Sequence, residues 1–172
     1  MGAVEFAMIA PLLLMLYITA FEVTIGLSVA KRATRSAGAI ADLTTQADTV
    51  NLATLNTMKD VAGAIFAPYS TDDMTLQITG IDVDSAGKAT VRWSWAGNGT
   101  APYAKNAAFS LPTNIATPSS FLVHARVSVP HELLMFMPGL MPASMQNITI
   151  SREYYFRQRI NDAVSCTGCP SG

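Results

Sequence analysis

Residues 6–30 read FAMIAPLLLMLYITAFEVTIGLSVA, and this stretch decides how the chain is organised. Its first part, Phe6–Phe21, contains no charged residue. As a helix these 25 residues would be about 38 Å long, enough to cross a bilayer whose hydrocarbon core is about 30 Å thick. The sequence therefore predicts a membrane-spanning helix, which we assign to residues 1–30.

Outside this stretch the composition is that of an ordinary folded domain. Hydrophobic residues make up 50% of the 172 residues and charged residues 13%, with a mean hydropathy of +0.30. The excess is concentrated at the N-terminus, where 22 of the first 30 residues are hydrophobic. A formal net charge of -1, with no block of basic residues, argues against nucleic acid as a partner.

A cleaved secretory signal peptide is the main alternative for the apolar stretch. Such a peptide begins with basic residues, continues with about 7–15 apolar residues and ends in a small-residue cleavage site. Here no basic residue precedes the apolar run, the run is longer, and no A-x-A pattern follows it before the charges begin. We therefore expect an anchor that is retained.

Two acidic residues, Glu5 and Glu22, lie beside and within the apolar stretch. A carboxylate deep in lipid costs on the order of 2.5–3.5 kcal/mol, so it usually has a partner or a function. The simpler alternatives are that Glu5 lies at the membrane surface beside a helix N-terminus and that a tilted helix brings Glu22 to the opposite interface. Lys31, Arg32 and Arg35 follow the stretch and can reach a headgroup layer.

Pro11 lies inside the predicted helix. A proline removes one backbone hydrogen bond and strains the preceding turn, which predicts a kink or a loosened turn near residues 7–11. We expect such a soft point to help the helix leave a bilayer.

These features together resemble the N-terminus of type IV pilin-like proteins, and most closely that of the TadE-like pseudopilins of the tight-adherence (Flp-type) pilus system. That family has a Glu-Phe-Ala segment, a nearby proline, a run of leucines and a second Glu late in the same helix. The corresponding residues here are Glu5-Phe6-Ala7, Pro11, Leu12–Leu14 and Glu22. The resemblance covers residues Met1–Gln46, and the remaining chain is similar only in general layout.

The resemblance implies a processing event. In pilin-like families a prepilin peptidase cleaves after a glycine and leaves a Glu at the fifth position of the mature chain. Glu5 occupies that position if Met1 is the first residue of the processed chain, which is the interpretation we favour. The alternative, with Met1 as initiator and Gly2 as the cleavage-site glycine, places the Glu at mature position three. The residues expected to act in assembly are Met1, Glu5, Phe6, Pro11 and Glu22.

The chemistry of Glu5 supports an assembly role. A free α-amino group and a carboxylate are both costly in an apolar filament core, and they can neutralise one another within a chain or between subunits. A buried pair of this kind is poor evidence for stability but a reasonable device for fixing register. We therefore expect Glu5 to set the axial register of assembly.

Partners and location also follow from the resemblance. The expected partners are other pilin-like subunits, a prepilin peptidase, a cytoplasmic assembly ATPase and, before assembly, membrane lipid, and no cofactor is expected. Lys31, Arg32 and Arg35 alone would favour a cytoplasmic head, whereas a basic leader that is later removed would hold the N-terminus inside. We expect a bacterial inner-membrane protein with its head in the periplasm, which becomes part of an extracellular pilus.

Residues 31–67 are expected to be helical. Lys31–Gln46 contains no proline and is rich in alanine, so the first helix should continue through it. A second helix can be capped by Asp48 or Thr49 and should end at Pro68. Its predicted apolar stripe consists of Leu55, Met58, Ala62 and Ile65.

Residues 68–172 are expected to form a β-rich head. Alternating hydrophobic residues predict strands at 74–83, 89–95, 121–129 and 148–156, with a bulge at Gly80. Asp84–Gly87 is typical of a hairpin turn and 98–118 of a loop. Residues expected to share one sheet face are Ala89, Val91, Trp93 and Trp95. The predicted fold class is α+β, with a long N-terminal helix and a second helix packed on a small antiparallel β-sheet.

An apolar, methionine-rich segment lies between the last two predicted strands and is broken by Pro138, Gly139 and Pro142. Such segments suit adaptable contact surfaces. It either folds over the sheet or forms a subunit contact or a loop that dips into the membrane. The residues assigned to the subunit contact are Met135, Phe136, Met137, Leu140 and Met141.

Cys166 and Cys169 form a Cys-x-x-Cys pair near the C-terminus, outside the strand-to-helix context of a redox motif. We favour a short disulfide loop formed in an oxidising compartment, with free thiols or bridges to another subunit as alternatives. A zinc site would need His124 and His131, whose spacing is poor. No metal site is therefore predicted.

No pattern in the sequence predicts catalysis, because nucleophile-elbow, zinc-protease, P-loop and dinucleotide fingerprints are all missing from it. The acidic pairs Asp72–Asp73 and Asp82/Asp84 are typical of turns, with a calcium site as the alternative. We predict a structural, pilin-like subunit that assembles through its N-terminal helix and contributes to surface attachment. The alternatives are a membrane-anchored binding or accessory module that never polymerises and, more remotely, a membrane-tethered enzyme.

Overall fold

The structure, a computed structural model, describes residues 2–112, 114–133, 147–158 and 162–170. It contains two helices, a four-stranded antiparallel sheet and a two-stranded parallel one, which confirms the predicted α+β fold. The helices are α1 (Gly2–Thr45) and α2 (Leu52–Phe66). The strands are β1 (Thr49–Asn51), β2 (Thr75–Val83), β3 (Ala89–Ala96), β4 (Ser120–Glu132), β5 (Asn147–Arg157) and β6 (Ser165–Thr167).

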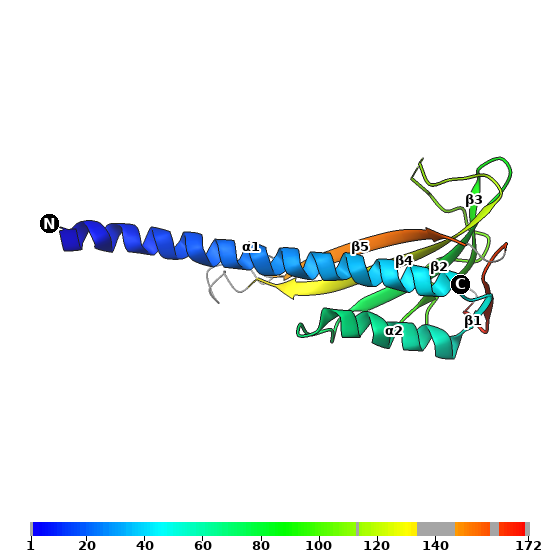
Figure 1. Ribbon diagram of the computed structural model, residues 1–172, viewed down its shortest axis with the longest axis horizontal. Helices are drawn as coiled ribbons and strands as arrows, with labels where there is room; N and C mark the ends of the chain where they lie inside the picture. The colour runs from blue at the N-terminus through cyan, green and yellow to red at the C-terminus, as the bar shows by residue number, and fades with distance from the viewer. Residues whose placement is uncertain (1, 113, 134–146, 159–161, 171–172) are drawn as a thin grey trace.

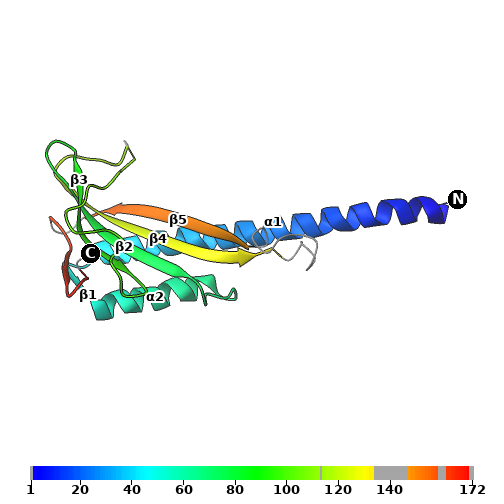
Figure 2. The ribbon, with the colours of Figure 1, turned by 180° about the vertical axis from the view of Figure 1, so that it is seen from behind.

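Helix α1 is a single helix of 44 residues that passes through Pro11 without a break. At 1.5 Å per residue it is about 66 Å long. Figures 1 and 2 show its C-terminal part lying along the sheet while its N-terminal part extends well beyond the head. The predicted extension of the first helix through residues 31–46 is confirmed to within one residue.

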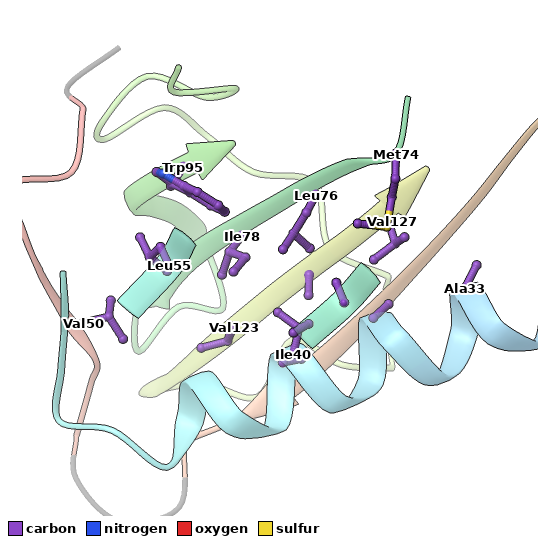
Figure 3. Close-up of a cluster of buried hydrophobic side chains, with 14 of the residues drawn as sticks. Ala33, Ile40, Val50, Leu55, Met74, Leu76, Ile78, Trp95, Val123 and Val127 are labelled. Atoms are coloured by element: carbon purple, nitrogen blue, oxygen red, sulfur yellow. The ribbon is translucent and has the colours of Figure 1, made fainter. Parts of the chain in front are cut away.

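The main sheet has the order β3-β2-β4-β5, and both helices cover one of its faces. Alternate residues of β4, such as Val123 and Val127, point toward the helices, and Leu76 and Ile78 of β2 do the same (Figure 3). The shared core between the sheet and both helices therefore contains side chains from nearly every element.

Small residues let α1 approach the sheet closely. Ala33, Ala37 and Ala41 are fully buried against it together with Ile40. A Cβ atom at Gly38 would lie 3.8 Å from the ring of Tyr154 in β5, which is ordinary van der Waals contact. The C-terminal half of α1 is thus a structural part of the head.

Helix α2 begins two or three residues later than the sequence suggested. Its N-cap is Asn51, whose side-chain Oδ1 accepts a hydrogen bond from the Thr54 backbone N–H at 2.8 Å. Asp48 and Thr49 are not the cap, because Thr49 lies in the short strand β1, which pairs in parallel with β6. The helix ends at Phe66, just before Pro68 as predicted. In the predicted stripe Leu55 and Ala62 are fully buried, whereas Met58 and Ile65 are partly buried.

The predicted bulge lies at Gly80, but its extra residue is on the neighbouring strand. Gly80 pairs with Trp93 and Ile81 pairs with Val91, which leaves Arg92 without a partner in the ladder. Because one inserted residue reverses the alternation, Ala89 and Val91 lie on the outer face of the sheet, and Trp93 and Trp95 lie on the helix face. The expectation that these four residues share one face is wrong for this reason.

The outer face of the sheet carries a second apolar cluster. It contains Ile81, Val83, Ala89 and Leu122, and residues of the 97–119 connection, including Phe109 and Leu111, pack against it. The described residues of this connection form no strand, in agreement with the predicted loop, and Ala108 forms an isolated bridge with Thr90 of β3.

Among the described glycines, Gly80 has the closest neighbouring side chains, so a substitution there tests the packing. A Cβ atom there would lie 2.5 Å from Trp93 Nε1 and 2.8 Å from Phe121 Cζ. Gly80→Ala should therefore destabilise the protein by about 1–3 kcal/mol through overpacking. For a chain of this size the thermal midpoint should fall by about 2–4 °C per kcal/mol, measured by circular dichroism in detergent micelles.

The matched control is Gly63→Ala in α2, where the nearest atom, Thr71 Oγ1, is 3.7 Å from the added Cβ. Alanine in a helix interior should raise stability by about 0.5–1 kcal/mol. Equal effects of the two substitutions would contradict the packing described around Gly80.

Candidate functional site

The first half of α1 is not buried by the described part of the head. Among the described residues 2–21 none is buried, and large apolar side chains are strongly exposed; Phe6, for example, is 69% exposed. The helix is long and apolar enough to cross a membrane. We call residues 2–21 the free segment and residues 22–45 the docked segment.

Three of the sequence-predicted assembly residues lie on the free segment. Glu5, Phe6 and Pro11 are all exposed, and the structure brings no residue of the described head against them. Met1 lies outside the described residues. The free segment therefore presents one carboxylate, near its start, on an otherwise apolar surface.

Glu22 is in a different position, because it is where the head first buries α1. Only 6% of its surface is exposed, and its Oε1 lies 3.0 Å from Nε2 of His131, whose side chain is 14% exposed. His131 lies near the end of β4, so the contact joins residues 109 positions apart in the chain. The predicted pair of membrane acids thus divides into one exposed residue and one held by the head.

Arg32 is also held by the head. Its Nη1 donates hydrogen bonds to the carbonyl oxygens of Ile65 at 2.9 Å and Ala67 at 2.7 Å, where the last carbonyls of α2 lack helical partners. Its guanidinium carbon lies 5.3 Å from the centre of the Tyr69 ring. The expectation that Arg32 reaches a lipid headgroup layer is therefore wrong, because the side chain caps α2 instead.

Comparison with protein families supports the resemblance of the N-terminus. Residues 1–42 match the family of TadE-like proteins. The N-terminal region of this chain is TadE-like. The match ends three residues before the end of α1, so it comprises the free segment and most of the docked segment. No curated protein and no solved structure shows a significant match to the chain.

The TadE-like region thus has two different surfaces on one helix. The free segment is apolar around its whole circumference, as expected for a helix surrounded by lipid or by other helices. The docked segment buries one side, formed by Val29, Ala33, Ser36, Ala37, Ile40, Ala41, Thr44 and Thr45 after Glu22. The head, which lies outside the TadE-like match, is built on that side.

The two histidines do not form a site together. His131 lies on the helix face of β4, whereas His124, seven positions earlier, faces the outer side of the sheet and stacks on Tyr155 with ring centres 4.6 Å apart. Across the part of the chain that the structure describes, no three His, Cys, Asp or Glu side chains are grouped so that they could hold a metal ion. The zinc alternative therefore has no geometric support.

Cys166 and Cys169 form a disulfide. Cys166 lies in β6, which pairs with β1 beside the start of α2, and Trp93 Nε1 donates a hydrogen bond to the Val164 carbonyl oxygen at 2.7 Å. The disulfide loop thus belongs to the end of the head that is remote from the free segment (Figure 1). Neither β1 nor β6 was predicted, because three-residue strands carry no periodic signal.

The acidic pairs in the turns have local partners. Asp82 accepts a hydrogen bond from Arg92 Nε at 2.7 Å, and Asp84 Oδ1 accepts from the backbone N–H groups of Ala86 and Lys88. Asp72 accepts from the Ser70 hydroxyl. These contacts fit turn-stabilising roles. The residues assigned to a subunit contact, Met135, Phe136, Met137, Leu140 and Met141, lie outside the described residues.

A polar pair, His124 and Glu153, lies beside the outer-face cluster. His124 is 1% exposed, and its Nε2 lies 3.2 Å from Glu153 Oε2. Burial lowers the pKa of His124, an effect that the Arg126 charge reinforces and the Glu153 carboxylate opposes. Burial, followed by the Glu153 charge, raises the pKa of Tyr155 to about 12.

Glu22 and His131 should be energetically coupled. Replacing either residue by alanine leaves its partner largely buried without this contact, which should cost about 1–3 kcal/mol of stability. The double variant should be less destabilised than the sum of the two single-variant effects, with a coupling free energy of about 0.5–3 kcal/mol. Thermal unfolding of the four proteins in detergent micelles measures this term.

The control is a second double-mutant cycle that combines His131→Ala with Glu132→Ala, since Glu132 is an exposed acid next to His131 in the sequence. These two substitutions should be additive. Additivity of Glu22→Ala and His131→Ala would show that the contact between these two side chains contributes nothing to stability.

His124 should make the head less stable in acid. Its folded-state pKa lies below the ordinary value of 6.5, so the unfolded chain takes up a proton first as the pH falls. The stabilising contribution is complete above pH 6.5 and is lost progressively below it. His124→Phe keeps a ring between Tyr155 and Phe109 but cannot titrate.

The thermal midpoint of the wild type should therefore fall more steeply between neutral pH and pH 5 than that of His124→Phe. Glu153, Arg126 and Tyr103, which also face His124 or its stacked neighbour, are common to both proteins. Parallel pH profiles would contradict the assignment.

Proposed function

We propose that this chain is a pilin-like structural subunit of a tight-adherence pilus system. The free segment anchors the subunit in the bacterial inner membrane, with the head in the periplasm. On assembly it exchanges lipid for the helices of other pilin-like subunits, and the head becomes part of an extracellular filament that takes part in surface attachment.

The observation that carries this proposal is the free segment itself. It is a 20-residue apolar helix that the described part of the head leaves uncovered, and it lies entirely within the TadE-like match. Fully burying one large aliphatic or aromatic side chain stabilises a protein by about 1.5–3 kcal/mol, so the free segment needs a cover. Membrane lipid surrounds the free segment before assembly, and the helices of neighbouring subunits surround it in the filament.

Glu5 sets the axial position of each subunit relative to its neighbours in the filament. On the free segment it is exposed in an apolar surface, so a neighbouring helix that packs over it would have to supply a positive group. The proposed partners are other pilin-like subunits, a prepilin peptidase and the pilus assembly machinery. No catalytic role is proposed.

Glu5→Ala tests this function directly. The variant should still insert into membranes, because the rest of the free segment is unchanged, but its incorporation into filaments should be strongly reduced. The measurement is the amount of the chain in sheared filaments relative to the membrane fraction, determined by quantitative immunoblotting.

Glu132→Ala serves as the control, since it removes an exposed acid from the head and leaves the free segment intact. It should be incorporated as the wild type is. Normal incorporation of Glu5→Ala would show that Glu5 has no role in assembly. Filaments that form normally without containing any of the wild-type chain would instead favour a membrane-anchored accessory module.

A further inference from the structure

The depth at which this chain lies in the membrane can be read from how its head packs on α1. By length alone, the apolar stretch suggests that lipid surrounds the helix as far as Ala30, because the first basic residue is Lys31. In the structure the head already contacts α1 at Glu22. Glu22 and Ala30 are separated by about 12 Å along the helix axis, so the two boundaries are clearly different.

Polar parts of the head lie beside this interval of α1. His131 contacts Glu22, and in the sheet ladder His131 pairs with Ile148 while Glu132 pairs with Asn147. About two turns closer to the C-terminus of α1, Ser28 Oγ accepts a hydrogen bond from the Tyr69 hydroxyl at 3.2 Å. A bilayer that reached Ala30 would have to immerse this whole end of the head.

Immersing that end of the head would be costly. Strand β5 is an edge strand, and its outer backbone groups pair with no strand among the described residues. Open sheet edges do not occur in hydrocarbon, since each unsatisfied backbone group there costs several kcal/mol. The Glu132 carboxylate, which is exposed, would add about 2.5–3.5 kcal/mol on insertion scales.

The free segment has the length that a boundary at Glu22 requires. Its 20 residues extend about 30 Å, which equals the thickness of a typical hydrocarbon core. Glu5 and Glu22 are separated by about 26 Å along the helix, so the two acids can lie near the two edges of that core. Arg32 does not demand a deeper position, because its side chain is bound to the end of α2. Lys31 and Arg35 are exposed and have long side chains that can extend back toward the headgroups from a position above them.

We propose that the hydrocarbon core ends at Glu22, so that residues 2–21 are the immersed part of the described α1 and the described β4–β5 end of the head rests on the lipid headgroups. The contact between Glu22 and His131 marks this level and holds the head there. Val23, Leu27 and the following turns of α1 then lie in water or among headgroups, although the sequence places them in one apolar run. This inference rests on the membrane anchoring in the proposed function.

Cysteine accessibility distinguishes the two boundaries. Leu27→Cys lies in the disputed interval and is a mild change, since Leu27 is 58% exposed. Leu13→Cys, within the free segment, is the immersed reference, and Thr34→Cys, exposed on the docked segment, is the aqueous reference. Membranes are freeze–thawed with a membrane-impermeant maleimide under non-reducing conditions, so that both surfaces are reached and the Cys166–Cys169 disulfide stays closed.

We expect Leu27→Cys to react to the same extent as Thr34→Cys while Leu13→Cys is protected, with each thiol fully reactive after denaturation. Protection of Leu27→Cys alongside a reactive Thr34→Cys would place the boundary near Lys31 and overturn the inference, leaving the proposed function intact. A reactive Leu13→Cys would overturn both, because the helix would not span a bilayer. If Leu27→Cys does not accumulate, Gly26→Cys replaces it, since an added Cβ there meets no atom within 4 Å.

Discussion

Close packing of the docked segment of α1 against the sheet is the constraint on which the rest of the structure depends. Ala33, Ala37 and Ala41 bring the helix backbone near the strands, and Ile40 fills the space between them. Because α1 is unbroken, fixing its second half on the sheet also fixes the direction of its first half. A force applied to the head is therefore transmitted directly to the free segment, as the proposed role in a filament requires.

One helix consequently meets two environments along its length. Up to Phe21 every described residue is at least partly exposed, and from Glu22 onward one side is covered by the head. The transition is made by a polar contact, Glu22 with His131, and by Arg32 at the end of α2. These polar groups give the boundary a definite position that a gradual decrease in hydrophobicity would not.

Local patterns in the sequence were sufficient to predict the main elements, and contacts between distant residues were not. The two helices and four long strands follow from periodicity, and the turn at Asp84 follows from its residue types. The position of Arg92 in the bulge, the Asn51 cap and the partner of Glu22 depend on segments far apart in the chain, up to 109 residues for His131. An isolated histidine in a strand gives no signal of which helix it will contact.

We predict that the chain reaches the cell exterior within filaments and keeps the packing between α1 and the head. The most direct measurement is electron cryomicroscopy of purified filaments, with peptide mass mapping to identify the subunits. We predict that residues 2–21 lie among other subunit helices at the filament axis and that residues 22–45 remain docked on the sheet. Filaments of normal length that lack this chain, while it stays in the membrane fraction, would contradict the account.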